Sequence, residues 1–532
     1  MFALGVAENL AAEMSRCTSS RQGWSSTLLT QSSVRLIEEL LVAGAAVSNS
    51  VLGGASFDDL KGQVRERLLI DPGFGNQPKR GALANSLPKK AEEFAPRTHR
   101  HVGVRQLVPQ LRADYLPNWA ASVTDPQAMI NTDPSSAATL LTAFLLGEGV
   151  HPAYLSRWLD YRRKHEPRTM TLGDLIHDLI DLIGHGEGTA EALVMLAQTV
   201  KPEVRSGPGW ITRRQVNEWL DENGLGGNGL VPRTMHGGII LRGSGRDIDG
   251  ILESASEAVH RVTHAALLKT GVMPKFHRLV WIKGLKAPRT LPSRTRLEHL
   301  LPNYDIPEPI MGRSASDDRL EVAVESIQAS VLAGGAAAAG MLWATVEGLF
   351  GSAGDQSKLV SGERAADVAT IAWIRFALTN TMGALIGKQG DPIFSSSLAG
   401  LSREASMLAL VAFLQGSDFS GIQSTRVVSQ ARHTADFLRP QEVRRLRAEI
   451  LTTFKGLYRQ RNLILHGGVT DAPLLAGILR SSTPLVTAAV NRFAANRAGA
   501  QGDPMAFAFA ESLRLDTHLA DPTGDLLTLA GY

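Results

Sequence analysis

The chain has 532 residues, of which 44% are hydrophobic and 20% are charged, and these globular values exclude wholesale disorder. The length exceeds what one ordinary core accommodates, so we expect roughly three or four domains. The net charge of +3 excludes a chain built throughout for binding polyanions. The single cysteine, Cys17, excludes intrachain disulfides and zinc sites with several thiolates.

No segment predicts export or insertion into a membrane. The N-terminus lacks a basic stretch before an apolar core, so it does not predict a signal peptide. The most apolar stretch, residues 331–343, is too short to span a bilayer. We therefore expect a cytoplasmic protein without a membrane partner.

Residues 1–104 predict an N-terminal helical region that ends in a linker. Pro, Gly and Lys punctuate residues 71–104 and remove any periodicity, which favours a long loop. The helical spacing of apolar residues before that loop is clearest at Leu36, Leu40, Ala43 and Val47.

Residues 105–205 predict a second helical domain. Pro134 and Pro152 are placed where helices commonly begin, and Thr171 is a suitable cap for a helix over residues 172–183.

Residues 206–314 predict a mixed α/β or linker-rich region. Residues 238–241 and 278–282 are short apolar runs with β-branched side chains, as in strands, and residues 251–269 between them predict a helix. A basic, proline-rich segment follows, and we expect the main domain boundary near Ser314.

Residues 315–532 are the most clearly helical part, so the fold class is mainly α and multidomain, with a small mixed α/β region in the middle. The expected helices cover residues 320–350, 363–385, 402–414 and 440–466, with further helix within 473–515.

The strongest candidate site lies at the end of the helix expected over residues 440–466. Arg461, Asn462 and His466 combine a guanidinium that binds phosphate with an imidazole that moves protons near neutral pH. Together these groups could cut a phosphodiester without a metal. Arg461 also occupies the next position of a stripe that runs through Ile450, Phe454 and Leu457, where a charge is costly unless it is paired or functional. The structural alternative is a helix-capping His466 and an Arg461 held in an ion pair.

The spacing of Arg461 and His466 sets a geometric condition. Side chains five residues apart on an ideal helix point roughly 140° away from each other. We therefore expect the two to converge only if the helix ends or distorts between them, beside Gly467, or if a second chain completes the site. Asn462 and His466 share a face with Tyr458.

This segment resembles the Arg-Asn-x3-His form of the signature of the HEPN superfamily. Upstream, residues 342–350 resemble the end of the first long helix of HEPN proteins, especially the ApeA-like group, and residues 362–366 resemble the start of the second. The resemblance covers roughly residues 315–500.

The resemblance implies a HEPN-like helical bundle that acts as a metal-independent endoribonuclease without a cofactor and dimerises to build a composite site. Arg461 would then bind the scissile phosphate, His466 would act as general base or acid, and Asn462 would orient the histidine or a phosphate oxygen. Glu347 would hydrogen-bond Arg461 across the bundle, with Tyr458 supporting the site. Relatives of this kind act in antiphage defence or as toxins, with other domains sensing a phage-derived or cellular trigger. The alternative is a non-catalytic HEPN scaffold that binds RNA or a partner protein.

Three other motifs carry weaker hypotheses. His260 and His264 have a metal-compatible spacing, but they lack the glutamate of a zincin and an obvious third ligand, which favours surface histidines over a metal-dependent hydrolase. Residues 224–229 spell GxGxxG without a preceding strand, which favours a plain loop. Trp281 predicts a packed side chain rather than a contact to nucleic acid.

Overall fold

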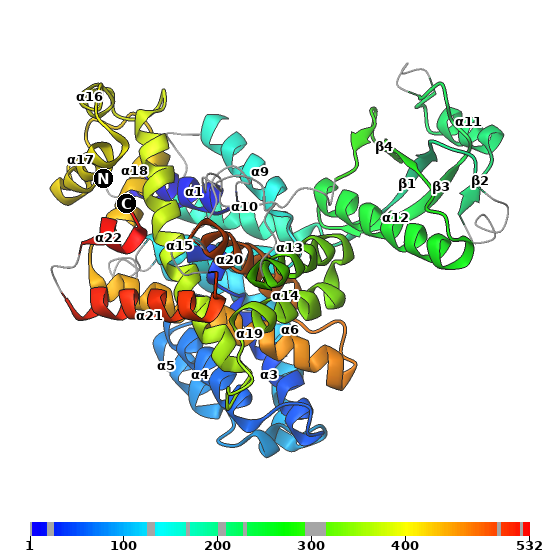
Figure 1. Cartoon of the computed structure of the whole chain (residues 1–532). Helices are drawn as coiled ribbons and strands as arrows, with labels where there is room; N and C mark the ends of the chain where they lie inside the picture. The colour runs from blue at the N-terminus through cyan, green and yellow to red at the C-terminus, as the bar shows by residue number, and fades with distance from the viewer. Residues whose placement is uncertain are drawn as a thin grey trace. The chain divides into compact units, whose positions relative to one another are not determined.

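The computed structural model describes residues 3–18, 26–124, 134–165, 171–200, 209–226, 231–292, 315–496, 502–521 and 525–532. The fold is mainly helical with a small antiparallel sheet in the middle region, as predicted (Figure 1). The chain forms two compact units. The first, here called the helical unit, comprises Met1–Gly147, Ser156–Leu179 and Leu297–Tyr532. The second, the sheet unit, comprises Glu148–Leu155 and Ile180–Arg296.

The expected division of the helical sequence into separate domains differs from what the contacts show. Residues 1–104, most of 105–205 and the described part of 315–532 share one compact unit. Helices distant in sequence pack together there, as α1 (Ala3–Thr18) does with α8 (Pro134–Gly147) and α18 (Thr425–Asp436). The expected boundary at Ser314 lies outside the described residues.

The prediction of a linker over residues 71–104 is wrong. This segment folds because its polar residues make caps: Asn76 accepts a hydrogen bond from Lys79 N at the start of its helix. Asp71 is buried and accepts hydrogen bonds of 2.7 Å from the hydroxyls of Ser33 and Tyr115. The N-terminal elements of the helical unit are α2 (Ser26–Leu29), α3 (Ser33–Ser48), α4 (Gly54–Ile70), η1 (Pro72–Phe74), α5 (Gln77–Ser86), η2 (Ala91–Phe94) and α6 (His99–Thr124).

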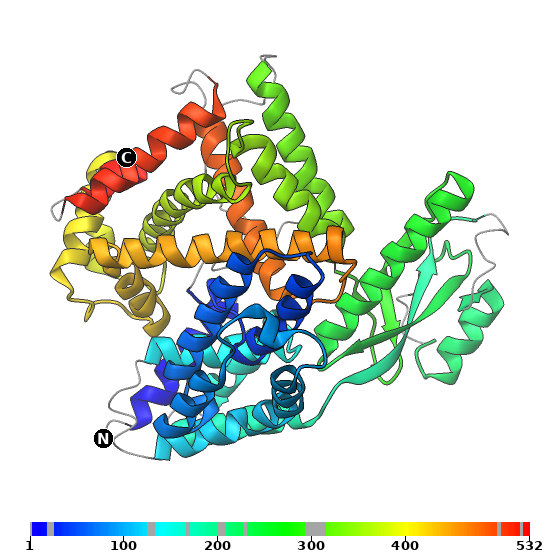
Figure 2. The same cartoon turned by 90° about the horizontal axis from the view of Figure 1, so that it is seen from below.

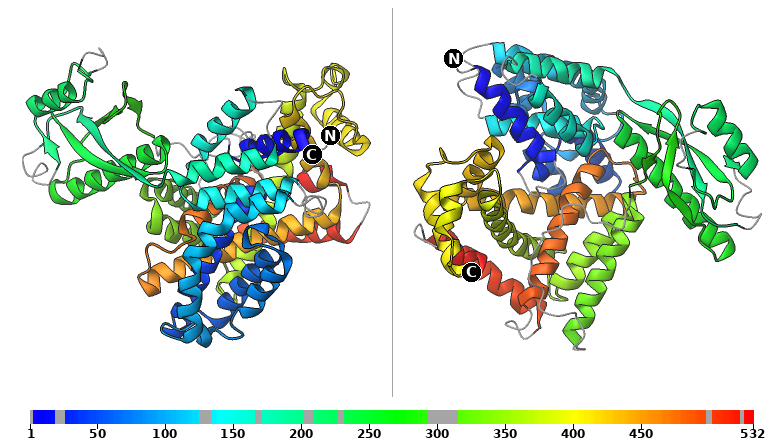
Figure 3. Two further views of the ribbon diagram at one scale, coloured as in Figure 1. Left: turned by 180° about the vertical axis from the view of Figure 1, so that it is seen from behind. Right: turned by 90° about the horizontal axis from the view of Figure 1, so that it is seen from above.

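The single helix expected over residues 320–350 is in fact two helices. Gly334 and Gly335 have φ of 64° and 51°, a conformation that glycine adopts without steric cost, and the chain turns there. The resulting α13 (Ala315–Ala333) and α14 (Gly335–Phe350) pack against each other, as the right-hand view of Figure 3 shows.

The other expected C-terminal helices are confirmed. They are α15 (Leu359–Ile386), α17 (Arg403–Gly416), α19 (Pro440–Gly467), α20 (Leu475–Asn496) and α21 (Pro504–Ala520), joined by the short α16 (Pro392–Ser397) and α22 (Leu526–Ala530). In the described part of the chain, α15 alone is long and apolar enough to cross a membrane, and 56% of its most apolar window is buried. It packs against α19, α20 and α21, which is the position of a central core helix.

The sheet unit contains an antiparallel sheet with strand order β2-β3-β1-β4-β5. The expected strands are confirmed as β3 (Gly238–Gly245) and β4 (Phe276–Ile282), and both pair with β1 (Gly188–Leu196). That strand falls within residues 105–205, so the prediction of a helical domain there is wrong for residues 188–196. The remaining elements at this part of the chain are β2 (Trp210–Ile211), β5 (Arg289–Thr290), α9 (Pro152–His165), α10 (Leu172–Gly184), α11 (Arg213–Glu222) and α12 (Ile248–Thr270).

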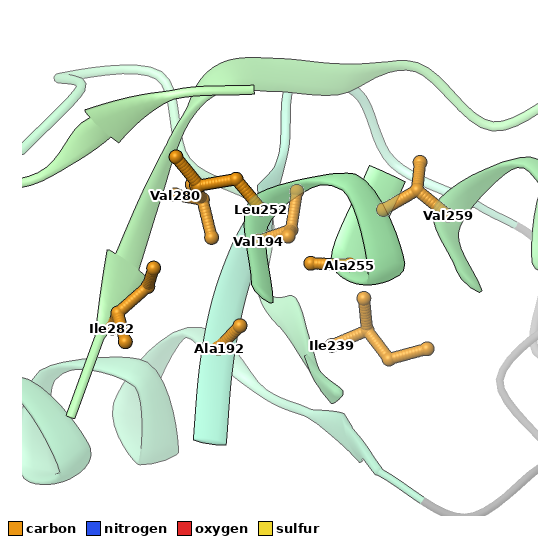
Figure 4. Close-up of a cluster of buried hydrophobic side chains, with 8 residues drawn as sticks. All are labelled: Ala192, Val194, Ile239, Leu252, Ala255, Val259, Val280 and Ile282. Carbon is orange, nitrogen blue, oxygen red and sulfur yellow. The ribbon is translucent and has the colours of Figure 1, made fainter. Parts of the chain in front are cut away.

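The two faces of the sheet bury separate apolar clusters. On one face, Val194, Ile239 and Val280 pack against α12, as Figure 4 shows. On the other face, Trp281 is fully buried among residues that include Trp219 of α11. The packed interpretation of Trp281 is therefore confirmed.

A buried polar contact joins the N-terminal helices to α19 in the helical unit. Glu39 of α3 is 0% exposed and Arg459 of α19 is 2% exposed, and Arg459 Nε lies 3.4 Å from Glu39 Oε1. Gln460 donates a hydrogen bond to the same carboxylate oxygen, and the backbone N–H of Leu474 donates to Oε2 over 3.3 Å. Burial raises the pKa of Glu39, against the opposing effects of Arg459, Leu474 and Gln460. Figure 2 shows the blue N-terminal helices beside the orange α19.

Replacing Glu39 with Ala would leave Arg459 as an uncompensated buried charge. We expect the free energy of unfolding to fall by about 3–5 kcal/mol, the usual effect of removing one partner of a buried ion pair. Urea denaturation followed by circular dichroism measures this change. Glu66→Ala removes an exposed glutamate of α4 and should change the free energy by less than about 0.5 kcal/mol. Superimposable curves for the two variants would contradict the structural role of Glu39.

Candidate functional site

The candidate residues occupy the last two turns of α19. The helix begins at Pro440 and runs without a break to Gly467, and Gly468 ends it in the left-handed region with a φ of 65°. Gly468 N–H bonds the carbonyl of Ile464 over 3.1 Å. Asn462 is buried, Arg461 is half-buried and His466 is exposed.

Arg461 and His466 meet within one chain. Arg461 Nη1 lies 2.9 Å from His466 Nε2 and also donates a hydrogen bond of 2.9 Å to Asn462 Oδ1. The expectation that a regular helix keeps the two side chains apart is wrong. The helix is unbroken between them, and the long arginine side chain reaches around it. A second chain is not required for this contact.

The contact fixes the hydrogen-bonding state of the imidazole. A guanidinium can donate hydrogen bonds but cannot accept them. His466 Nε2 must therefore accept, so the ring is neutral and carries its proton on Nδ1. In this geometry the lone pair that would serve a general base is occupied by Arg461.

The supporting residues are placed differently from the expectation. Asn462 bonds Arg461 and makes no hydrogen bond to His466, so it orients the arginine rather than the histidine. Glu347 is half-buried on α14 and makes no hydrogen bond to Arg461, so that expected contact is wrong. Tyr458 packs its ring on Trp343 of α14 with the ring centroids 4.9 Å apart.

Three of the other four arginines of α19 pair with carboxylates, one of them Arg459 with Glu39, and the fourth, Arg444, donates to the carbonyl of Leu519. Arg445 pairs with Glu449 at 3.1 Å, and Arg447 pairs with Asp367 at 2.6 Å and with Asp516 at 2.8 Å. Within the described residues, no carboxylate pairs with Arg461, whose two partners are both neutral. An uncompensated guanidinium beside a neutral imidazole, open to solvent, can receive an anion such as a phosphodiester.

The buried contact of Glu39 with Arg459 and Gln460, which supports this site, was not predicted from the sequence. Glu39 lies on the apolar face of α3, close to Leu36 and Leu40, where a carboxylate is costly without a partner. The position of Glu39 on that face therefore indicates a buried, paired carboxylate. Its partner could not be identified from the sequence, because Arg459 stands in a basic run that equally suits a solvated helix face.

The other sequence motifs do not build a site. His260 and His264 have ring centroids 6.3 Å apart, and the described residues contain no cluster of three His, Cys, Asp or Glu side chains that could hold a metal. The glycine-rich segment at Gly224 follows α11 rather than a strand, and residues 227–229 lie outside the described part.

No protein-family model, curated protein or solved structure matches this chain.

The geometry predicts a fixed tautomer for His466. Nitrogen NMR of protein labelled at histidine should show the ring of His466 at neutral pH with the proton on Nδ1, because Arg461 can only donate to Nε2. His466→Ala identifies the signal by its loss. In Arg461→Ala the preference for this tautomer should disappear. A proton on Nε2 in the unmodified protein would contradict the contact.

Proposed function

We propose that this protein is a metal-independent endoribonuclease whose site consists of Arg461, Asn462 and His466. The observation that carries the proposal is the contact between Arg461 and His466, in which an uncompensated cation lies 2.9 Å from a neutral imidazole. The resemblance of this segment to the HEPN signature also supports a ribonuclease function. We also propose that the protein acts in the cytoplasm as an effector of antiphage defence or of growth arrest, released by a phage-derived or cellular trigger.

The proposed reaction begins when the RNA phosphate competes for Arg461. Non-bridging phosphate oxygens draw the guanidinium away from His466, and Asn462 keeps it oriented. The freed Nε2 takes the proton of the 2′-hydroxyl, and the 2′-oxygen attacks phosphorus. The bond to the 5′-oxygen breaks, which leaves a 2′,3′-cyclic phosphate and, after protonation, a 5′-hydroxyl end.

We propose a dimer because the 2′-oxygen enters and the 5′-oxygen leaves from different sides of the phosphorus. In an in-line displacement the entering and leaving oxygens lie on opposite sides of phosphorus. One imidazole can therefore exchange a proton with the entering oxygen or with the leaving oxygen, but not with both. In a homodimer formed through the C-terminal helices, His466 of a second copy, in its protonated imidazolium form, would donate the proton to the 5′-oxygen and become neutral, while the first His466 becomes protonated. The alternative function is a non-catalytic scaffold that binds RNA or a partner protein, in which Arg461 keeps its contact with His466.

Substitutions of the two proposed catalytic residues test the function. We expect His466→Ala and Arg461→Ala each to lower the rate of RNA cleavage at least about 100-fold, because each removes the proton-transfer group or the phosphate ligand. The measurement is cleavage of end-labelled RNA with and without EDTA, with analysis of the ends and, in parallel, of growth arrest on expression. EDTA should not change the rate.

His264→Ala is the matched control, because His264 is an exposed histidine of the sheet unit. It should cleave like the unmodified protein. Equal cleavage by all four proteins would overturn the catalytic assignment. RNA binding without cleavage, equally strong in both site variants and in the control, would favour the scaffold.

A further inference from the structure

A cleft opens in the helical unit at the C-terminal end of α19. It has a volume of about 590 Å³, which is within the usual range for small-molecule sites. Its walls come from α3, from α6 and from the loop after α19. Gly467, the residue that follows His466, lines it, and a Cβ added there would lie 3.1 Å from Val51, so the wall is closely packed.

The walls of the cleft combine an apolar lining with polar groups. The polar groups include Asn49, His101, Arg105 and Asp471. An apolar lining with a few hydrogen-bonding groups is typical of small-molecule sites and suits a heteroaromatic ligand such as a nucleobase. The apolar residues of the lining include Val42, Ala45, Val51, Val108, Val469 and Pro473.

Two side chains of α6 are placed to stack on such a ligand. His101 and Arg105 are four residues apart on one helix and therefore share a face. Burial, together with the neighbouring Arg105, lowers the pKa of His101, so its ring is neutral and presents a π-face. Arg105 is exposed and makes no hydrogen bond or ion pair within the described residues. Aromatic rings and guanidinium planes are the platforms on which proteins stack single-stranded bases.

The remaining arginines of the cleft are already engaged. Arg35 and Arg112 both pair with Glu38, and Arg35 also donates to the carbonyl of Gly147 over 2.9 Å. Both guanidiniums are thus held in place by the one carboxylate of Glu38. Arg105 makes no such contact within the described residues and is therefore the guanidinium of the cleft that a ligand recruits without breaking an ion pair.

We propose that this cleft binds the base of the nucleotide whose 2′-hydroxyl is attacked. The inference rests on the proposed function, because it is His466 that takes the proton from that hydroxyl. The cleft adjoins the residue after His466, so the nucleotide on the 5′ side of the cleaved bond is the one whose base enters it. The base stacks on His101 and Arg105.

The cleft also sets a preference among bases. Asp471 is exposed and has no hydrogen-bond partner within the described residues, and a carboxylate can only accept. It accepts a hydrogen bond from an N–H group on the edge of a base, and these donors lie at different positions on adenine, guanine, cytosine and uracil. Cleavage should therefore depend on the base at the 5′ side of the cleaved bond.

Filling the cleft tests this proposal. Ala45→Phe places a ring in the slot from a half-exposed position, and Ala82→Phe adds the same ring to an exposed position of α5 as the control. Sequencing of the fragments from a random RNA pool should show the same base preference on the 5′ side of the cleaved bond in the unmodified protein and in Ala82→Phe. Ala45→Phe should lose the preference and raise KM by about tenfold or more. An unchanged preference in Ala45→Phe would overturn the proposal.

A binding measurement separates this proposal from the catalytic one. Adenosine 3′-monophosphate is titrated into the His466→Ala protein, and the ring signals of His101 are followed by proton NMR. Shifts that saturate in His466→Ala and in Arg65→Ala, which removes an exposed arginine of α4 outside the cleft, but weaken about tenfold in Arg105→Ala, support the cleft. This result stands even if no cleavage is found. Absence of any shift in His466→Ala would overturn the cleft whatever the activity.

Discussion

The buried carboxylate of Glu39 is the constraint on which the candidate site depends. It joins three donors from different places: the side chains of Arg459 and Gln460 at the end of α19, and the backbone of Leu474 beyond the loop. A charge in the interior is tolerated only where such partners surround it. The interaction therefore fixes the last turns of α19 and the following loop against α3. Arg461 comes directly after Gln460, so the same interaction fixes the backbone position of the arginine that is proposed to bind phosphate.

The burial of Glu39 lowers the stability of the folded chain, although its hydrogen bonds fix the position of the end of α19. Because the pKa of Glu39 is raised in the folded chain, the folded state binds its proton more tightly than the unfolded state does. The contribution of Glu39 is then most favourable below the unfolded pKa and is lost as the pH rises through the folded pKa. Ionisation of the buried carboxylate therefore costs stability. Buried ionic groups of this kind are kept in some proteins because they specify one arrangement, and we infer that role here.

The sequence predicted local structure well and long-range structure poorly, for physical reasons. Helix over residues 440–466 followed from periodicity and from the flanking Pro440 and Gly467, which are local signals. The strand β1 was missed because a short apolar run does not distinguish strand from helix. The condition set for the convergence of Arg461 and His466, a broken helix or a second chain, was wrong because the helical angle describes the directions of Cβ atoms and neglects the reach of a long side chain. The pairing of Glu39 with Arg459 joins residues 420 positions apart, which no local pattern encodes.

The N-terminal helices extend the proposed site beyond the segment that resembles HEPN proteins. Lys455 of α19 bonds Asp59 of α4 over 2.8 Å, and Gln31 bonds Ser481 of α20 over 3.1 Å, in addition to the contact of Glu39. These contacts place the N-terminal and C-terminal helices in one packed unit. The walls of the cleft beside His466 then come largely from α3 and α6, whereas the proposed catalytic residues come from α19. Chemistry and substrate selection would thus be encoded by different parts of the chain, and a displacement of α3 would disturb both, because the carboxylate of Glu39 holds α3 to the end of α19.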